Sequence, residues 1–554
     1  MKSKLSIFIT FGYSMSKNIL YILTYTIAFF FCMQISCNNP VSNKKIFQFN
    51  QVQNVESLDP AFAKNQNIMW HVHIIYDRLI EFDENMHTQP SLAKSWEVSE
   101  DRLTYTFHLR NDVFFQDNEI FAHGKGRKMT AQDVAYSFGR IIDEKTASPG
   151  AWIFNDRVDT LHAFAAIDDT TFQMKLLRPF NPMMGILSMQ YCSVVPHEMV
   201  EKWGKDFRSH PCGTGAFKLQ DWEEGVVLTY RKNEHYWQKD SDGVRLPYID
   251  GIKVTQVDSK ATEFLLFMQG DLDFMNGIDA SFKDQVLSKK GELKEEYISK
   301  IKLQKHPYLN VEYLGILMDE TKNEQKILLN KKIRQAINYG FDRKKLVTYL
   351  RNNIGIAANA GIIPIGLPGY DSNIVKGYTY NPEKAKKLIE EVKKETSALP
   401  SITLLSNDNY SDRCTFIASQ LSNIGLDIKI EIMQPSLLRE QMSNSNASFF
   451  WATWIADYPD AESYLTMFYG KNTAPPNYTR FQNATFDKLY EQCLVEPNDE
   501  KKIALFEQMD RIIIDEAPCV PLFYDEVMHF IQNRITNWKT NNLNLLEIKY
   551  VKIK

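Results

Sequence analysis

Alternation of hydrophobic and polar residues predicts several half-buried strands. The stretch LTYTFHLR (103–110) places Leu, Tyr, Phe and Leu on one face, and LDIKIEIM (426–433) alternates in the same way. IFQFNQV (46–52) reads as a further strand. FFWATW (449–454) is almost entirely apolar, which is typical of a strand that is buried on both faces.

Two stretches with apolar residues every three or four positions predict amphipathic helices. The first is 381–395, where Asn381 can cap the N-terminus. The second is 129–143, where Thr130 and Asp133 have the spacing of a capping box. The expected buried stripes are Ala385, Leu388, Ile389 and Val392 in the first helix and Val134, Phe138 and Ile141 in the second.

A strand, a helix and a strand follow one another in the C-terminal third of the chain. SITLLS (401–406) precedes a helical stretch, 411–425, which ends at Gly425, and the strand 426–433 comes next. This order is typical of a βαβ unit, in which two parallel strands are covered by a helix. We therefore predict an α/β fold for this region.

The N-terminus has the pattern of a secretory signal peptide. An apolar run, 19–31, follows Lys17 and precedes a polar segment. Cys37 lies where a lipoprotein signal ends in the cysteine that is acylated, although Gln34 replaces the usual leucine. An ordinary signal peptide and a single anchor helix are the alternatives, and Met15 is a second possible start. We predict export and a lipid anchor at Cys37.

Composition narrows the classes of function. The 554 residues suggest two to four domains, and 44% hydrophobic residues suffice for a core. The net charge of −4 argues against nucleic acid as a partner, since phosphate binding needs a basic surface. The 7 cysteines form no C-x-x-C pair. We expect buried thiols, with one or two disulfides as the alternative.

Motifs for catalysis or metal binding are missing from the sequence. It contains no G-x-S-x-G, H-E-x-x-H or phosphate-binding loop. His71 and His73 form an H-x-H pair, which we interpret as part of a helix or loop surface and not as a metal site. We expect neither an enzyme nor a bound cofactor or metal.

Several stretches together resemble the family 5 extracellular solute-binding proteins of ABC importers, which carry oligopeptides, dipeptides and nickel chelates. They are SLDPAFA (57–63), PSLAKSWEVSEDRLTYTFHLRNDVFF (90–115), PCGTGAFKL (211–219), KKIRQAINYGFDRKKLV (331–347) and WIADYPDAESYL (454–465). Their order is that of the family and they span nearly all of the chain after Cys37. Two features depart from the family pattern, namely an insertion between residues 115 and 129 and Cys212 in place of Val or Ile.

The resemblance implies an α/β clamshell of two lobes, with mixed sheets flanked by helices. Two crossings of the chain act as a hinge, and the ligand is enclosed between the lobes. The expected division is a signal peptide at 1–37; a discontinuous lobe I at 38–82, 205–300 and 520–554; an inserted subdomain at 83–204; and lobe II, which anchors the ligand, at 301–519.

The resemblance also implies the ligand-binding residues. In the peptide-binding branch, an aspartate in a W-x-A-D-Y context neutralises the α-amino group of the peptide, and Asp457 matches it. The alternative is that Asp457 pairs with a protein Arg or Lys or caps the helix at 461–468, for which Asp460 is the better candidate. Further expected contacts are the main chain of Thr453, Trp454 and Ile455, a pocket wall of Trp454 and Tyr458, and, more loosely, Asn276.

The resulting prediction is a monomeric, lipid-anchored receptor on the periplasmic side of a bacterial membrane. It captures peptides and delivers them to the permease subunits of an ABC transporter. The alternatives are a binding protein for a nickel chelate or a sugar, and a peptide sensor or chaperone-like receptor without transport.

Overall fold

The computed structural model describes residues 44–396 and 399–554. Ile46–Lys554 forms one compact unit. The predicted signal peptide and the lipidation site Cys37 lie outside the described residues. Among the described helices, none has the length and apolar character needed to cross a membrane.

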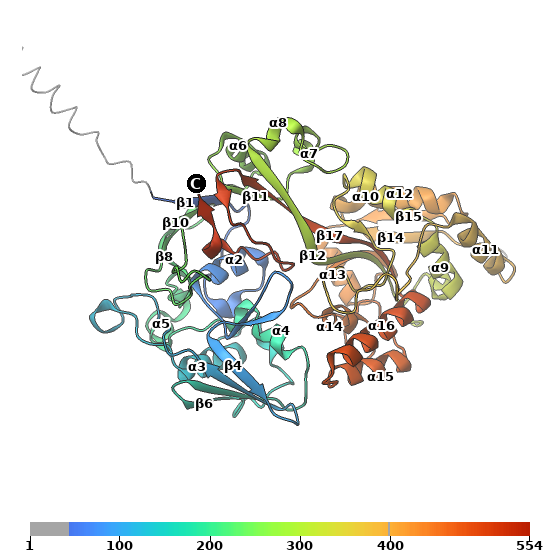
Figure 1. Ribbon diagram of the computed structural model, residues 1–554. Coiled ribbons are helices and arrows are strands. Elements are labelled where there is room, and N and C mark those ends of the chain that lie inside the picture. The colour runs from blue at the N-terminus through green and yellow to red at the C-terminus, as the bar shows by residue number, and fades with distance from the viewer. Residues whose placement is uncertain (1–43, 397–398) are drawn as a thin grey trace, which may run out of the picture. The chain divides into compact units, whose positions relative to one another are not determined.

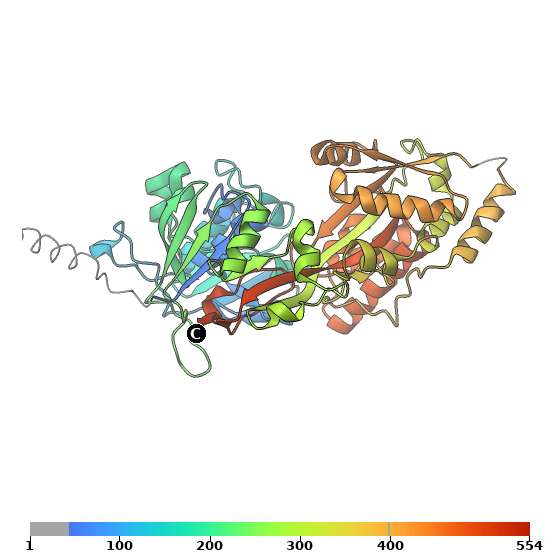
Figure 2. The same cartoon turned by 90° about the horizontal axis from the view of Figure 1, so that it is seen from above.

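An 11-stranded mixed sheet extends through both lobes of the α/β fold, in the order β15-β14-β16-β12-β17-β11-β1-β10-β9-β8, with β13 paired to β17. β12 and β17 are much longer than their neighbours and run between the two groups of elements in Figures 1 and 2. Their bounds are β12 (Ile301–Ile316) and β17 (Cys519–Gln532). They are therefore the two crossings between the lobes.

On the lobe I side, the large sheet is completed by strands from the first half of the chain. These are β1 (Ile46–Asn50), β8 (Phe217–Glu223), β9 (Val227–Lys232), β10 (Gly251–Thr255) and β11 (Phe274–Asn276). The helices on this side are α2 (Gln66–Ile75), α6 (Lys260–Gln269), α7 (Ala280–Val286) and α8 (Glu295–Ile298). Two short pairs are β2 (Ile80–Phe82) with β3 (Thr88–Pro90) and β18 (Ile535–Thr536) with β19 (Lys552–Ile553).

A second, antiparallel sheet of four strands lies within the predicted subdomain. Its order is β4 (Ala93–Val98), β5 (Thr104–Leu109), β7 (Thr171–Lys175) and β6 (Phe164–Asp168). Its helices are α3 (Ala131–Ile142), α4 (Met183–Leu187) and α5 (His197–Trp203). Buried residues of this sheet, such as Phe107 and Phe172, belong to the same hydrophobic core as Phe47 and Phe49 of β1. The four-stranded sheet is thus packed onto lobe I through a shared core.

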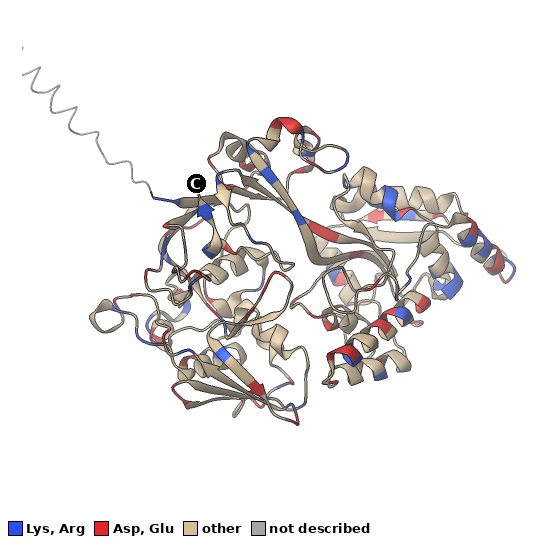
Figure 3. Ribbon diagram, in the orientation of Figure 1, with Lys and Arg blue, Asp and Glu red and all other residues tan. Residues whose placement is uncertain are grey.

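Lobe II contains the predicted βαβ unit. β14 (Ile402–Ser406) and β15 (Ile428–Ile432) are parallel and are joined by α12 (Ser411–Ser422), as the sequence predicts. The other elements are β13 (Ile356–Ala357), β16 (Phe449–Ile455), α9 (Lys331–Tyr339), α10 (Arg343–Leu350), α11 (Pro382–Lys393), α13 (Pro435–Ser443), α14 (Glu462–Leu465), α15 (Ala484–Cys493) and α16 (Asp499–Glu516). Lysines and acidic residues are interspersed along α11 and α16 (Figure 3), which suits helices with a solvated face.

The local signals for both amphipathic helices are confirmed. In α3, the Thr130 side chain and the Asp133 carboxylate form the reciprocal bonds of a capping box. In α11, the Asn381 side chain accepts a hydrogen bond from the backbone of Lys384. The expected stripes are buried, except that Leu388 is only partly buried.

The interpretation of the H-x-H pair is wrong in one respect. Both histidines lie on α2, but His71 is completely buried and bonds Tyr230 and Gln51. His73 is half-buried and pairs with Glu547 at 3.1 Å. The helix α2 is buried on more than one face, since Ile68, Trp70, Val72, Ile74 and Ile75 are all buried. Both histidine rings therefore lie within the protein. The pair is therefore structural and does not belong to the surface.

Five cysteines lie among the described residues, and each is a buried free thiol. They are Cys192, Cys212, Cys414, Cys493 and Cys519. Cys32 and Cys37 are outside the described part of the chain.

Candidate ligand-binding cleft

The strand β16 has one open edge at its C-terminal end. It pairs with β12 along its whole length, whereas its described pairing with β14 is limited to Phe450 opposite Leu405. The amide of Ala456 donates to the carbonyl of Leu309, and hydrogen-bonded pairs alternate along antiparallel strands. Thr453 and Ile455 therefore direct their main-chain groups away from β12. The open edge can accept an added strand.

Asp457 follows this edge after Ala456. The Asp457 side chain is exposed to solvent, but the protein atoms around it remove part of the water that would hydrate its carboxylate. This partial loss of hydration raises the pKa of the carboxyl group to about 6. Within residues 44–396 and 399–554, no side chain forms an ion pair with this carboxylate. Its own amide lies 3.4 Å from the Ser463 hydroxyl. The carboxylate is consequently free for a cationic group of a ligand.

Asp460 has the capping role that the sequence predicts. Its carboxylate accepts a hydrogen bond of 2.9 Å from the backbone N–H of Glu462, the first residue of α14. The N-cap position itself is occupied by Ala461. Since Asp460 supplies this bond, the helix does not require Asp457.

Trp454 and Tyr458 are fixed by neighbouring residues. The Trp454 indole donates to the carbonyl of Ser463 at 2.6 Å, which holds the half-buried ring beside the open edge. Tyr458 is buried and donates its hydroxyl hydrogen to Glu462. Its ring lies so close to Gly185 of α4 that an added Cβ there would be 3.2 Å away. Tyr458 thus joins lobe II to the core that is shared by lobe I.

Asn276 does not lie beside the open edge of β16. It lines a cleft of about 580 Å³, together with residues from both groups of elements. This volume is within the usual range for small-molecule sites. The described lining does not include residues 453–458; its polar and charged members are Gln66, Asn276, Lys283, Tyr308, Arg351, Asp408, Asn409, Ser411, Asp412, Arg413, Asp525, Glu526 and Asn544.

A chain of hydrogen bonds connects the cleft to the open edge of β16. The Thr453 hydroxyl donates to the Asn310 side chain at 2.7 Å. Asn310 in turn donates to Asp525 at 3.1 Å, and Asp525 lines the cleft. The structure therefore brings Thr453 close to the cleft wall that also carries Asn276.

Two arginines of the cleft were missed by the sequence analysis. Arg351 forms an ion pair with Asp525. Arg413 is mostly buried, its Nε lacks a hydrogen-bond partner among the described residues, and its nearest acid is Asp412 at 3.8 Å. One signal could have revealed Arg413: it follows β14 at the carboxyl end of a parallel strand, where ligands of α/β folds commonly bind.

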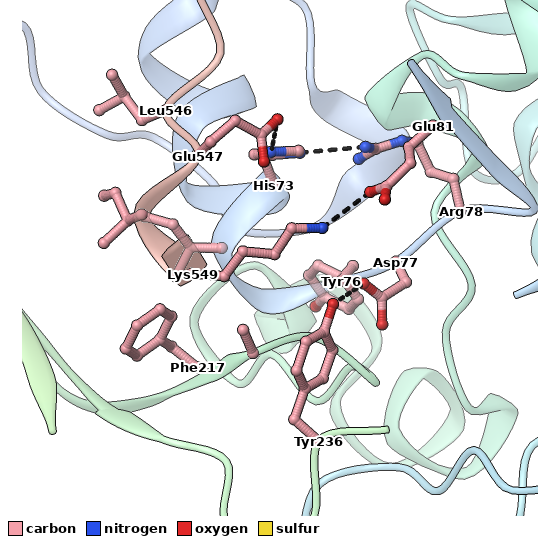
Figure 4. Close-up of a pocket in the computed structure, with 13 residues that line it drawn as sticks. His73, Tyr76, Asp77, Arg78, Glu81, Phe217, Tyr236, Leu546, Glu547 and Lys549 are labelled. Atoms are coloured by element: carbon pink, nitrogen blue, oxygen red, sulfur yellow. Dashed lines mark hydrogen bonds and ion pairs between the residues drawn. The ribbon is translucent and has the colours of Figure 1, made fainter. Parts of the chain in front are cut away.

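A second cavity, shown in Figure 4, is much smaller and has a structural role. Its volume is about 20 Å³, enough for roughly one water molecule. Two charged pairs already occupy its wall: Lys549 contacts Glu81 at 2.9 Å, and His73 contacts Glu547 at 3.1 Å. This cavity therefore offers no room for a solute.

The protein has two lobes that are joined by two strands, and a cleft and an unpaired carboxylate lie near these strands. This arrangement is that of a solute-binding protein. The model of the family "Bacterial extracellular solute-binding proteins, family 5 Middle" matches residues 87–476. The chain belongs to this family of bacterial extracellular solute-binding proteins.

Known members show the extent of the similarity. The chain is 27% identical over 470 residues to heme-binding protein A of Haemophilus influenzae, covering 81% of both chains. It is 24% identical over 532 residues to dipeptide-binding protein DppE of Bacillus subtilis, covering 92% of both. Among solved structures, the periplasmic binding protein DppA of Helicobacter pylori, in complex with the peptide STSA, has a TM-score of 0.73 and 23% identity. That comparison covers 92% of this chain and 98% of the other.

Proposed function

We propose that the protein captures short peptides outside the cytoplasm and delivers them to the permease of an ABC importer. The observation that carries this proposal is the unpaired carboxylate of Asp457 beside the open edge of β16. A carboxylate in this position suits the α-amino group of a peptide, because a charge-assisted hydrogen bond is stronger than a neutral one.

The peptide main chain pairs with Thr453 and Ile455 as an added strand. Such pairing does not depend on side-chain identity, so it suits a receptor for many sequences. Trp454 stands beside the first ligand side chain, and Asn276 contacts the ligand from the opposite part of the cleft. Tyr458 supports the site from behind, since its ring is buried.

The C-terminal carboxylate of the peptide meets Arg413. Among the residues that the structure describes, the Arg413 guanidinium forms one ion pair, a long one of 3.8 Å with the exposed Asp412, so an incoming carboxylate can compete for it. The similarity to a dipeptide-binding protein and to a solved complex with a peptide supports a ligand that has both an ammonium and a carboxylate.

The remaining parts of the proposal concern the placement of the protein. The segment 1–37 acts as a signal peptide, Cys37 carries the lipid anchor, and the receptor acts as a monomer without catalytic activity. Lobe I, the inserted subdomain and lobe II follow the predicted division. In this division the boundary at 300/301 coincides with the start of β12, and the boundary at 519/520 lies one residue after the start of β17.

Native mass spectrometry of the protein, purified from its host without refolding, tests the ligand class. We expect a set of additional masses that correspond to short peptides and disappear after mild denaturation. A bound haem, sugar or nickel chelate in their place would contradict the peptide proposal. Uptake of radiolabelled peptide by cells with and without the protein then separates transport from sensing.

A further inference from the structure

Glu312 is a buried carboxyl group directly behind the proposed binding site. It lies in β12 between Thr453 of β16 and Phe523 of β17, and 5% of it is exposed. The Trp451 indole donates a hydrogen bond of 2.6 Å to its Oε2 atom. In the part of the chain that the structure describes, no Lys, Arg or His lies within ion-pair distance of Glu312. Filling the core at this position does not require a carboxyl group, so we expect a functional reason for Glu312.

A stack of side chains connects Glu312 with the cleft. The ring of Trp451 stacks on Tyr410 with the centroids 4.7 Å apart and the planes at 13°. The Arg413 guanidinium lies over the other ring of this stack, 5.3 Å from the Tyr410 centroid. Arg413 itself lines the cleft. The Arg413 guanidinium is therefore linked to Glu312 through two aromatic side chains.

The charged and titratable groups that face Glu312 come from several elements. They are Asp525 of β17, Arg351 after α10, Arg413 of α12, Tyr410 of the short 3₁₀ helix Asp408–Tyr410, and Tyr313 of β12. Burial raises the pKa of the Glu312 carboxyl to about 7, and Asp525 acts in the same direction. The Trp451 hydrogen bond and the two arginines oppose this shift, because they stabilise the carboxylate.

We propose that Glu312 becomes fully protonated, with the proton taken from solvent, when the carboxylate of a bound peptide reaches Arg413. The incoming negative charge is attracted to Arg413 and repels the Glu312 carboxylate in a region of low polarity. Protonation of Glu312 removes this repulsion: its Oε2 still accepts from Trp451 and the other oxygen carries the proton. Glu312 is thus a positioning residue that supplies negative charge to the empty site and gives it up to the ligand. The inference rests on the proposed peptide function.

Isothermal titration calorimetry at pH 7.0, in buffers of different ionisation enthalpy, measures the coupled proton. The probes are tri-alanine and tri-alanine amide, and the proteins are the wild type and Glu312→Gln. With a group that is half protonated near this pH, the wild type should take up about 0.5 proton more than Glu312→Gln on binding tri-alanine. The peptide α-amino group and Asp457 contribute equally in both proteins, so the difference belongs to Glu312.

The two peptides provide an independent comparison. Tri-alanine amide has the same α-amino group but no carboxylate, so the wild type should take up about 0.5 proton less with the amide. This comparison needs only the wild-type protein and remains decisive if Glu312→Gln does not fold. Equal proton uptake by the wild type and Glu312→Gln, or by the two peptides, would overturn the inference alone. No binding of tri-alanine to the wild type would overturn the peptide function and the inference with it.

Discussion

Asp457 is the residue on which the proposed peptide binding most depends. A ligand that lacks a cation would leave this carboxylate without a partner when the cleft closes, at a cost of roughly 3–5 kcal/mol. The residue therefore selects ligands as well as binding them.

Asp457→Asn should weaken the binding of tri-alanine at pH 7.5 at least tenfold, as measured by calorimetry, because the charge-assisted bond is lost. The melting temperature of the empty protein should stay the same or rise slightly. The reason is that the pKa of Asp457 is raised in the folded state, so its charged form at pH 7.5 does not stabilise the fold.

The exposed Asp427, which directly precedes β15 at the amino end of the parallel pair β14 and β15, provides a matched control. Asp427→Asn removes an equal charge at the end of this pair that lies away from the open edge of β16, and it should alter neither quantity. A large loss of stability in the empty Asp457→Asn protein would instead show that Asp457 has a structural partner.

Asp510 is a buried acid that makes stability depend on pH. Asp510 of α16 is 2% exposed and accepts a hydrogen bond of 2.7 Å from the amide of Ile362. Burial raises its pKa to about 7, above the value of an unfolded chain. Its contribution to stability is thus present at low pH and is lost as the pH rises through 7.

The variant Asp510→Asn should remove this dependence. Between pH 5 and pH 8, the wild type should lose about 2–3 kcal/mol of unfolding free energy through Asp510, and the variant should lose that much less. Urea denaturation at the two pH values measures the difference. Parallel losses in the wild type and the variant would exclude Asp510 as the source.

The open edge of β16 is the element that most directly explains broad peptide recognition. Thr453 and Ile455 direct their main-chain N–H and C=O groups toward this edge. The main-chain groups of the intervening Trp454 point the other way and pair with β12. An added strand would meet the edge only at alternate residues.

Ester analogues of tri-alanine test this pairing, since each ester replaces one amide N–H by oxygen. One of the two single-ester peptides should bind about fivefold more weakly, which corresponds to about 1 kcal/mol for one hydrogen bond. The other should bind nearly as well as tri-alanine. Competition calorimetry measures both. Equal affinities for all three peptides would show that main-chain pairing with β16 is not used.

At the level of elements, the sequence predicted much of lobe II and of the first sheet. The apolar alternation in β5 and β15 and the capping residues of α3 and α11 are local signals, so a short window contains them. The open edge of β16 depends on where β14 ends relative to it, and this is a long-range property. The cluster around Arg413 and Glu312 is missing from the sequence analysis for the same reason: its members come from α12 and β12.

The whole unit from Ile46 to Lys554 is held together by β12 and β17 at its centre. Their pairing is interrupted by a register shift between Glu312 and Tyr313 and by a longer one between Pro307 and Val311. Tyr308, which lines the cleft, lies within this shift. We expect the two lobes to change their relative orientation at this irregular segment.

Closure of the lobes should be visible in solution. Saturating tri-alanine should decrease the radius of gyration that small-angle X-ray scattering measures for the wild type. Asp457→Asn should need at least a tenfold higher peptide concentration to reach half of this decrease, because it binds the peptide correspondingly more weakly. An unchanged radius in a wild-type sample that calorimetry shows to be saturated would mean that binding does not move the lobes.

The register shift in the central pair of strands has a mechanical consequence. A ribbon of two strands resists stretching, because its covalent chains run along it, but it twists more readily than a wide sheet. The easiest deformation of the protein is thus a torsion about the ribbon axis, with little loss of strand pairing. The two halves of the binding site would then approach each other along a screw-like path, and a peptide would be gripped progressively from one end to the other.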